Sequence, residues 1–144
     1  MFRISSDAID PAAELGKLND PRAGARVSFE GLVRNHNQGR AVNSLEYECF
    51  EALAQHEAEA ILQEARHRFE VCDLACIHRV GHLQIGEIAV FAAATAAHRD
   101  EAFAACRYLI DQIKLRLPIW KKEHYADGDS QWVNCQACHA LQTL

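Results

Sequence analysis

The sequence contains few prolines that would interrupt helices or strands, and no segment typical of export or membrane insertion. It has three prolines and one methionine, and it shows no internal repeat or low-complexity stretch. The N-terminal stretch MFRISSDAID lacks the apolar centre and cleavage pattern of a signal peptide, so we expect a cytoplasmic protein. The longest apolar run, residues 88–97, is too short to cross a bilayer and predicts a buried strand.

The chain also lacks the positive charge of a general nucleic-acid-binding protein. Its formal net charge is −5, with 49% hydrophobic and 24% charged residues, which is an ordinary composition for a globular protein. A length of 144 residues is enough for one domain with a genuine core. We expect a single domain over residues 1–134 and a flexible C-terminal tail over residues 135–144.

Six cysteines are present, and a cytoplasmic location would keep them reduced. Cys72 and Cys76 lie in a strand-like run and Cys106 lies on an apolar helix face, so we expect small buried thiols there. In the tail, residues 135–139 match the C-x-x-C-H pattern of haem attachment. Haem attachment requires export, for which the sequence shows no signal peptide, and an axial methionine is also lacking because Met1 is the only methionine.

The same tail motif leaves a zinc site open as a second interpretation. Cys135, Cys138 and His139 would supply three ligands, and a fourth would have to come from elsewhere. One such pair of cysteines is half of a convincing motif, so a reduced tail without metal is the favoured interpretation.

Hydrophobic periodicity predicts strands interleaved with two long helices. Asp10 as the N-cap and Pro11 as the first helical residue favour a short helix. Apolar residues at spacings of three and four predict two longer helices, one over residues 50–69 and one from residue 100 to the proline at 118. Residues 25–34 alternate, and we expect residues 44–50 to be their hairpin partner. The pattern predicts an α+β domain with a mixed or antiparallel sheet, and strands at residues 2–5, 25–34, 44–50, 72–78, 87–96, 119–125 and 131–134.

A cationic cluster surrounds Pro118 in this acidic chain. Proline ends a helix and forces the preceding residue into an extended conformation, so Lys114 should lie at the end of a helix and Lys121 on the next strand. Strand alternation places Lys121 on the side of Ile119, and we expect it to point inward. The two lysines could then bind one anion or act as acid or nucleophile, whereas the alternative is a set of lysines on a solvated face.

Two other stretches can bind anions. Arg34 ends a strand before a polar loop and could present its guanidinium group to phosphate or carboxylate, although alone it is more typical of an exposed hairpin end. His98 and Arg99 stand where the buried strand gives way to a helix, whose free N–H groups favour anions. The alternative is a pair of solvated residues beside a helix cap.

Taken together, these stretches resemble the catalytic (large) subunit of molybdopterin synthase. The resemblance covers about residues 1 to 134, and its strength lies in the order of the pieces. They are GARVSFEGLVRNHN at 24–37, LEYE at 45–48, HRVG at 78–81, AHR at 97–99 with EAF at 101–103, PIWKKE at 118–123, DG at 127–128 and WV at 132–133.

The resemblance implies a sulfurtransferase of molybdenum cofactor biosynthesis. Such an enzyme converts cyclic pyranopterin monophosphate to molybdopterin with two sulfurs from the thiocarboxylated C-terminal glycine of a small ubiquitin-like partner. It also implies an α/β-hammerhead-like fold with an extra antiparallel β subdomain, and a heterotetramer built on a dimer of large subunits. It implies no cofactor and no metal in the pocket.

Carried over by position, the resemblance also implies a set of site residues. Lys114 and Lys121 would be catalytic, and the substrate-binding set would be Leu32, Val33, Arg34, His98, Arg99, Lys114, Lys121, Lys122 and Glu123. We expect Arg34, His98 and Arg99 to hold the pterin phosphate, while the two catalytic lysines meet the thiocarboxylate and the reacting carbon. Two functions of other classes use the same residues or the tail. One is a non-catalytic binding module for a phosphorylated small molecule, and the other is a small zinc-binding regulator.

Overall fold

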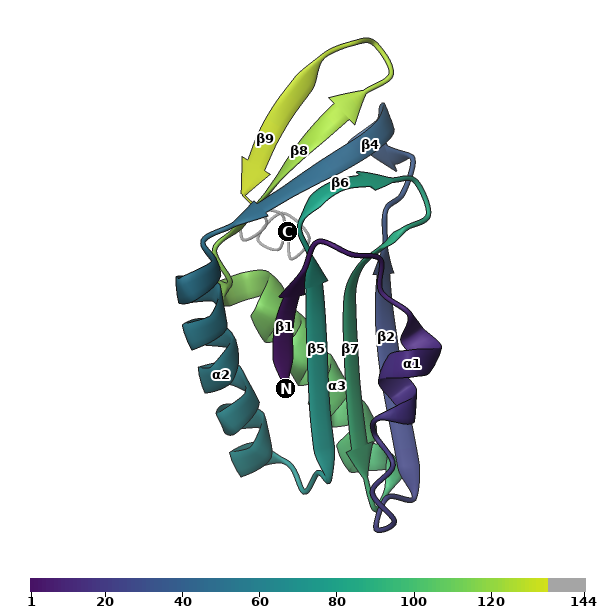
Figure 1. Cartoon of the computed structure of the whole chain (residues 1–144), viewed down its shortest axis with the longest axis vertical. Coiled ribbons are helices and arrows are strands. Elements are labelled where there is room, and N and C mark those ends of the chain that lie inside the picture. Colours follow the sequence, from purple (N-terminus) through teal and green to yellow (C-terminus); the bar gives the residue numbers. More distant parts are fainter. Residues whose placement is uncertain (135–144) are drawn as a thin grey trace.

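The computed structural model describes residues 1–134, so the tail with Cys135, Cys138 and His139 lies outside the described residues. Within that part the chain forms two sheets and three helices (Figure 1). The elements in order are β1 (Phe2–Ser5), α1 (Pro11–Gly16), β2 (Ala25–Leu32), β3 (His36–Asn37), β4 (Arg40–Cys49), α2 (Glu51–Arg68), β5 (Asp73–Arg79), β6 (Gly81–Gln84), β7 (Ile88–Ala96), α3 (Arg99–Arg116), β8 (Ile119–Tyr125) and β9 (Ser130–Asn134).

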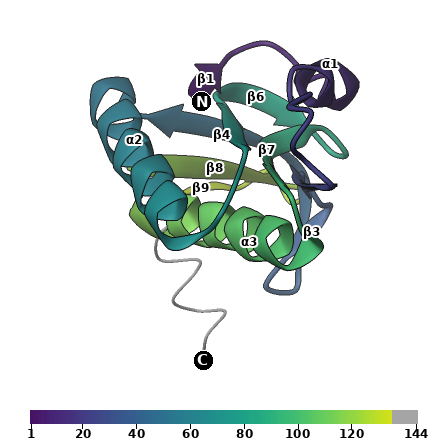
Figure 2. The same cartoon turned by 90° about the horizontal axis from the view of Figure 1, so that it is seen from below.

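The first sheet has the strand order β1-β5-β7-β2 and is covered on both faces. β1 runs parallel to β5, and the other neighbours are antiparallel. Cys76, Ala92 and Ala94 pack with buried residues of α2 and α3 on one face, while Ile77 and Phe91 pack with the α1 region on the other. Burial on both faces explains why β7 is a continuous apolar run rather than an alternating one. Figure 2 shows α2 and α3 side by side along the sheet.

The second sheet has the order β3-β4-β8-β9, and β6 pairs with β4. It lies beyond the upper end of the first sheet in Figure 1, where α2 begins and α3 ends. β4 leads directly into α2, and β8 follows α3 after one proline. The backbone N–H of Phe50 donates a hydrogen bond to the carbonyl of Pro118 at 3.3 Å, which joins these two connections.

Most of the expected elements are confirmed, including the α+β class, both long helices and the capped α1. Asp10 accepts a hydrogen bond from the N–H of Ala13 at 3.2 Å, as an N-cap does. Cys76 and Cys106 are buried, as expected, whereas Cys72 is half-buried immediately before β5. Among residues 1–134, no helix has both the length and the apolar character needed to cross a bilayer.

The expected hairpin between residues 25–34 and 44–50 is wrong. β2 pairs with β7 over its whole length, from Ala25 opposite Ala96 to Leu32 opposite Ile88. The chain then crosses to the second sheet, where β4 pairs with β3, β6 and β8. Alternation identifies a strand but not its partner, and β6 was missed because four residues are too few to show a period.

A close backbone approach fixes the lower end of β2. The N–H of Gly24 donates to the carbonyl of Ala96 at 2.9 Å, and a Cβ at position 24 would lie 2.4 Å from the Ala97 carbonyl oxygen. The backbone atom cannot move aside as a flexible side chain could. Only glycine therefore fits here without a shift of the β7–α3 connection.

Gly24→Ala is expected to lower the free energy of unfolding by about 1–3 kcal/mol, because the added methyl group forces the backbone apart. Urea denaturation followed by circular dichroism measures this. Gly16→Ala is the matched control, since a Cβ there meets nothing within 4 Å, and it should change stability by less than about 1 kcal/mol. Equal stability of the two variants would contradict the close approach.

Candidate active site

Pro118 separates the two lysines onto two elements, as the sequence predicts. α3 ends at Arg116, Leu117 is extended with φ −72° and ψ 138°, and β8 begins at Ile119. Lys114 therefore lies in the last turn of the helix and Lys121 near the start of the next strand.

Alternation along β8 points Lys121 inward. Ile119, Glu123 and Tyr125 lie on its face of the strand and are buried. The Lys121 side chain is 17% exposed, so it lies in a largely dry place but remains accessible. Trp120 occupies the opposite face and is exposed. The predicted inward orientation is confirmed.

A buried carboxylate holds Lys121. Its Nζ lies 3.3 Å from Oε1 of Glu123, whose side chain is 1% exposed. The Nδ2 of Asn37 donates to the same oxygen at 2.6 Å, and Nη2 of Arg34 donates to Oδ1 of Asn37 at 3.3 Å. These contacts connect Arg34, in the loop after β2, and Asn37, in β3, to Glu123 in β8, and 86 residues of sequence separate Asn37 from Glu123. Arg34 is exposed, so its guanidinium group remains open to a ligand beside the lysine.

Lys114 approaches the same region from the helix side. Burial, and to a smaller extent the nearby charge of Lys114, lower the pKa of His78 to about 4, against a hydrogen bond with the Arg79 carbonyl. The ring of Tyr47 meets the His78 ring edge-on at 5.2 Å. Tyr47 also lies opposite Lys121 in the β4–β8 register, so their side chains emerge on one face. Tyr47 and His78 therefore connect the surroundings of Lys121 with those of Lys114.

The other residues expected at this end have different surroundings. Val33 is buried, and its backbone hydrogen bonds go to Glu87 and Gly86, so it anchors the loop that carries Arg34. Leu32 is exposed. Lys122 lies on the opposite face of β8 from Lys121, with its Nζ 5.6 Å from the centre of the Trp132 ring.

His98 and Arg99 lie at the other end of α3. His98 is the N-cap residue, Arg99 is the first helical residue, and both are exposed. Fifteen residues of helix separate Arg99 from Lys114, which is roughly 22 Å along the axis. Figure 1 shows the two ends of α3 at opposite ends of the first sheet. Within one chain, the structure does not bring this pair to the lysines.

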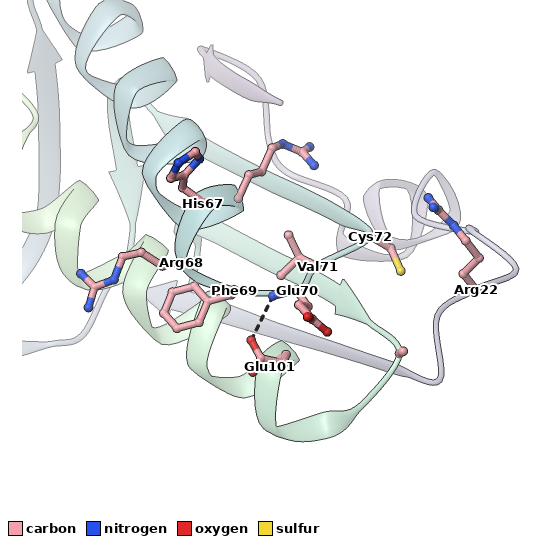
Figure 3. A pocket seen from close by; sticks show the side chains of 10 residues that line it. Arg22, His67, Arg68, Phe69, Glu70, Val71, Cys72 and Glu101 are labelled. Carbon is pink, nitrogen blue, oxygen red and sulfur yellow. Dashed lines mark hydrogen bonds between the residues drawn. The ribbon is translucent and has the colours of Figure 1, made fainter.

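A second cationic region lies near that distant end. A shallow hollow of about 730 Å³ is lined by Arg22, Arg66, His67, Arg68, Phe69, Glu70, Val71, Cys72, Ala97 and Glu101 (Figure 3). Sequence reasoning did not identify it, because its arginines come from separate segments. Arg22 pairs with Asp20 at 2.7 Å, and Arg68 lies over the Tyr108 ring at 4.8 Å. In Figure 3 these two arginines lie at opposite ends of the hollow, so they do not converge on one ligand.

Among residues 1–134, three residues could hold a metal ion: Glu46, His82 and His124. They lie on the outer face of the second sheet, because His124 alternates with Glu123 along β8. They are therefore separate from Lys121 and Glu123, which lie on the other face of β8.

The buried His78 predicts a pH-dependent stability. Its pKa in the folded protein is about 4, below the ordinary value near 6.5, so the unfolded chain binds the proton more readily. This contribution is fully present above pH 6.5 and is lost as pH falls toward 4. Between pH 7.5 and 5, the wild type should lose about 2 kcal/mol more than a His78→Gln variant. Urea denaturation at both pH values measures this difference. His56→Gln, at an exposed position of α2, should keep the wild-type pH dependence.

Comparisons with known proteins agree with this architecture. Residues 4–116 match the MoaE protein family. The chain is 46% identical to a molybdopterin synthase catalytic subunit of a Nostoc species over 127 residues, covering 87% of this chain and 77% of the relative. A structure of molybdopterin synthase from Staphylococcus aureus superposes with a TM-score of 0.85 at 34% identity, over 91% of this chain and 95% of that one.

A more distant structure shares the fold. It is a complex of subunits 1 and 2 of molybdopterin-converting factor from Helicobacter pylori, and one of its chains matches with a TM-score of 0.74 at 22% identity. The match covers 92% of this chain and 88% of that one. The family match extends over most of the sequence, from within β1 to the end of α3. The chain therefore belongs to the MoaE protein family.

Proposed function

We propose that this chain is the catalytic subunit of a molybdopterin synthase. It would convert cyclic pyranopterin monophosphate to molybdopterin with two sulfurs from a thiocarboxylated partner. The observation that carries the proposal is the position of Lys121, which is largely dry, paired with a buried carboxylate and linked through Asn37 to Arg34. A surface lysine without such partners would support binding but not chemistry.

The charges of the site suit the reactants. A cyclic phosphate and a thiocarboxylate are both anions, so cations must neutralise them before they can approach each other. Arg34 is the exposed cation at the edge of the site, and Lys114 and Lys121 are the cations within it. When the thiocarboxylate sulfur bonds to the reacting carbon, a carbon–oxygen bond breaks, and the departing oxygen needs a proton that a lysine ammonium group can donate. Water then hydrolyses the resulting thioester, which leaves the sulfur on the product and releases the partner with a C-terminal carboxylate. A lysine could instead hold the substrate as a transient covalent adduct.

Glu123 and Asn37 position the reactive group rather than react. Lys121 and Asn37 both contact Oε1 of Glu123, which restricts the rotamers of the long lysine side chain. Glu123 is too deeply buried to meet a substrate phosphate, and its negative charge would repel one. Its assignment to the substrate-binding set is therefore best understood as indirect.

His98 and Arg99 can join this site only from a second copy of the chain. They lie roughly 22 Å from Lys114 along one rigid helix, which is farther than any arginine side chain reaches. In a dimer with two-fold symmetry, His98 and Arg99 of each chain would enter the site of the other chain, so the dimer would contain two equivalent shared sites. The expected homodimer of large subunits thereby acquires a chemical role, because each site needs residues from two chains.

The sulfur donor would be a small subunit with a C-terminal glycine thiocarboxylate. The complex of two subunits seen in the Helicobacter pylori fold relative supports a partner of this kind. Two small subunits on a dimer would give the expected heterotetramer. The cytoplasmic location stays a prediction from the sequence.

A non-catalytic module for a phosphorylated small molecule is the alternative. It would use Arg34 and the lysines as anion-binding groups. It would not need a lysine that is largely buried and paired with a carboxylate. Product formation in the presence of the partner distinguishes the two functions.

Lys121→Ala is expected to lower molybdopterin formation on the order of a hundredfold or more, because it removes the proposed proton donor. The assay mixes the chain with a thiocarboxylated small subunit and the pterin precursor, and measures molybdopterin. Lys17→Ala, at an exposed position paired with Glu14, is the matched control and should keep wild-type activity. Near-normal product formation by Lys121→Ala would show that the assignment is wrong.

A mixing experiment tests the shared site. Lys121→Ala and the double variant His98→Ala/Arg99→Ala should each be inactive alone. After the chains are exchanged at equal concentration, about a quarter of wild-type activity should return, because random pairing gives half heterodimers and each has one intact site. If the two proteins exchange subunits but no activity returns, His98 and Arg99 do not act in the partner's site.

A further inference from the structure

The outer face of the second sheet carries two histidines and a glutamate from three adjacent strands. Glu46 lies on the central strand β4, His82 on β6 and His124 on β8. Nδ1 of His82 lies 3.4 Å from Oε1 of Glu46, and Nε2 of His124 lies 3.3 Å from the same oxygen. The two imidazole rings are 5.5 Å apart.

Strand pairing fixes this arrangement in the backbone. Glu46 is opposite His82 in the β4–β6 register, so their side chains share one face. Ser44 is opposite His124 in the β4–β8 register, and Ser44 and Glu46 share a face because they are two residues apart. The three side chains thus converge from regular strands rather than from loops, and such sites are held more rigidly.

The distances between the ligand atoms fit a tetrahedral metal site. Zinc binds imidazole nitrogen and carboxylate oxygen at about 2.0–2.2 Å, so two ligand atoms of a tetrahedron lie about 3.3–3.5 Å apart. Both nitrogen-to-oxygen separations have this value. The two nitrogens lie within 4.8 Å, and rotation of the half-exposed rings can shorten that distance.

The charge balance also favours a cation between these groups. The carboxylate of Glu46 lies close to both imidazole rings, 3.4 Å from Nδ1 of His82 and 3.3 Å from Nε2 of His124. Nε2 of His124 is buried, and its contact with Oε1 of Glu46 at 3.3 Å does not have the geometry of a hydrogen bond. Lys122 lies opposite Glu46 in the register, but its ammonium group lies over the Trp132 ring, where it does not fill the space between the two imidazoles.

We propose that Glu46, His82 and His124 bind one divalent transition-metal ion of the zinc type, with a fourth position open to water. Two imidazoles and one carboxylate form a ligand set of known zinc sites with an open position. The ion would join β6, β4 and β8 on the face opposite Lys121. This site is separate from the residues of the proposed function and uses none of the cysteines of the tail.

Zinc binding to the full chain tests the proposal. The background protein carries Cys135→Ser, Cys138→Ser and His139→Ala, so that the tail motif cannot contribute. Equilibrium dialysis with metal analysis should find one zinc ion per chain. His82→Ala and His124→Ala should each weaken binding at least tenfold, and Glu46→Gln should weaken it as well. His56→Ala, at an exposed helix position, is the matched control and should bind as the background does.

Cobalt substitution tests the ligand types independently. Co²⁺ in the site should give the visible absorption of a four-coordinate ion without a thiolate charge-transfer band. Circular dichroism of each variant verifies that it is folded, so a loss of binding is not a loss of structure. Binding of zinc by His82→Ala and His124→Ala as tightly as by the control, or no binding by the background at millimolar zinc, would overturn the proposal.

Discussion

The site depends on a single buried charge, the carboxylate of Glu123. An ionised group almost without solvent exposure is costly unless it is paired and hydrogen-bonded, and Lys121 and Asn37 supply those partners. The cost makes the arrangement specific. Both partners contact Oε1, whereas Oε2 of Glu123 is buried and makes no hydrogen bond among the described residues. The contacts of Oε1 hold Lys121 and Asn37 at one place, and Asn37 in turn contacts Arg34.

The two-sheet architecture explains why these partners can meet. The first sheet is packed on both faces, and α3, which packs on one of them, carries Lys114 in its last turn. The second sheet supplies Lys121 and Glu123, and β4 contributes Tyr47 opposite Lys121. Pro118 is the junction, because it stops the helix and starts the strand within two residues. Separate elements thus deliver each group at a fixed distance.

The sequence predicted those parts of the structure that depend on local chemistry. Alternation around Lys121 gave its inward face, and the proline gave the change from helix to strand. The hairpin between residues 25–34 and 44–50 failed because strand pairing depends on which edge is free, and β7 occupies the edge of β2.

Position in space was the other limit of sequence reasoning. Resemblance assigned His98 and Arg99 to the substrate, but only the length of α3 showed that one chain cannot bring them to Lys121. Asn37 and His78 were present in the matching stretches. The contact of Asn37 with Glu123 and that of His78 with Tyr47 became visible only in the folded structure.

The alternation of β8 limits how this chain can vary in length. Lys121 and Glu123 point inward, while Lys122 and His124 point outward, so the two faces of one short strand serve different purposes. One residue inserted or deleted between Pro118 and Lys121 would exchange the faces, turning Lys122 toward the core and Glu123 toward solvent. Many substitutions in this segment would be milder than a change of one residue in length. The spacing of the strand, as much as its composition, is thus under constraint.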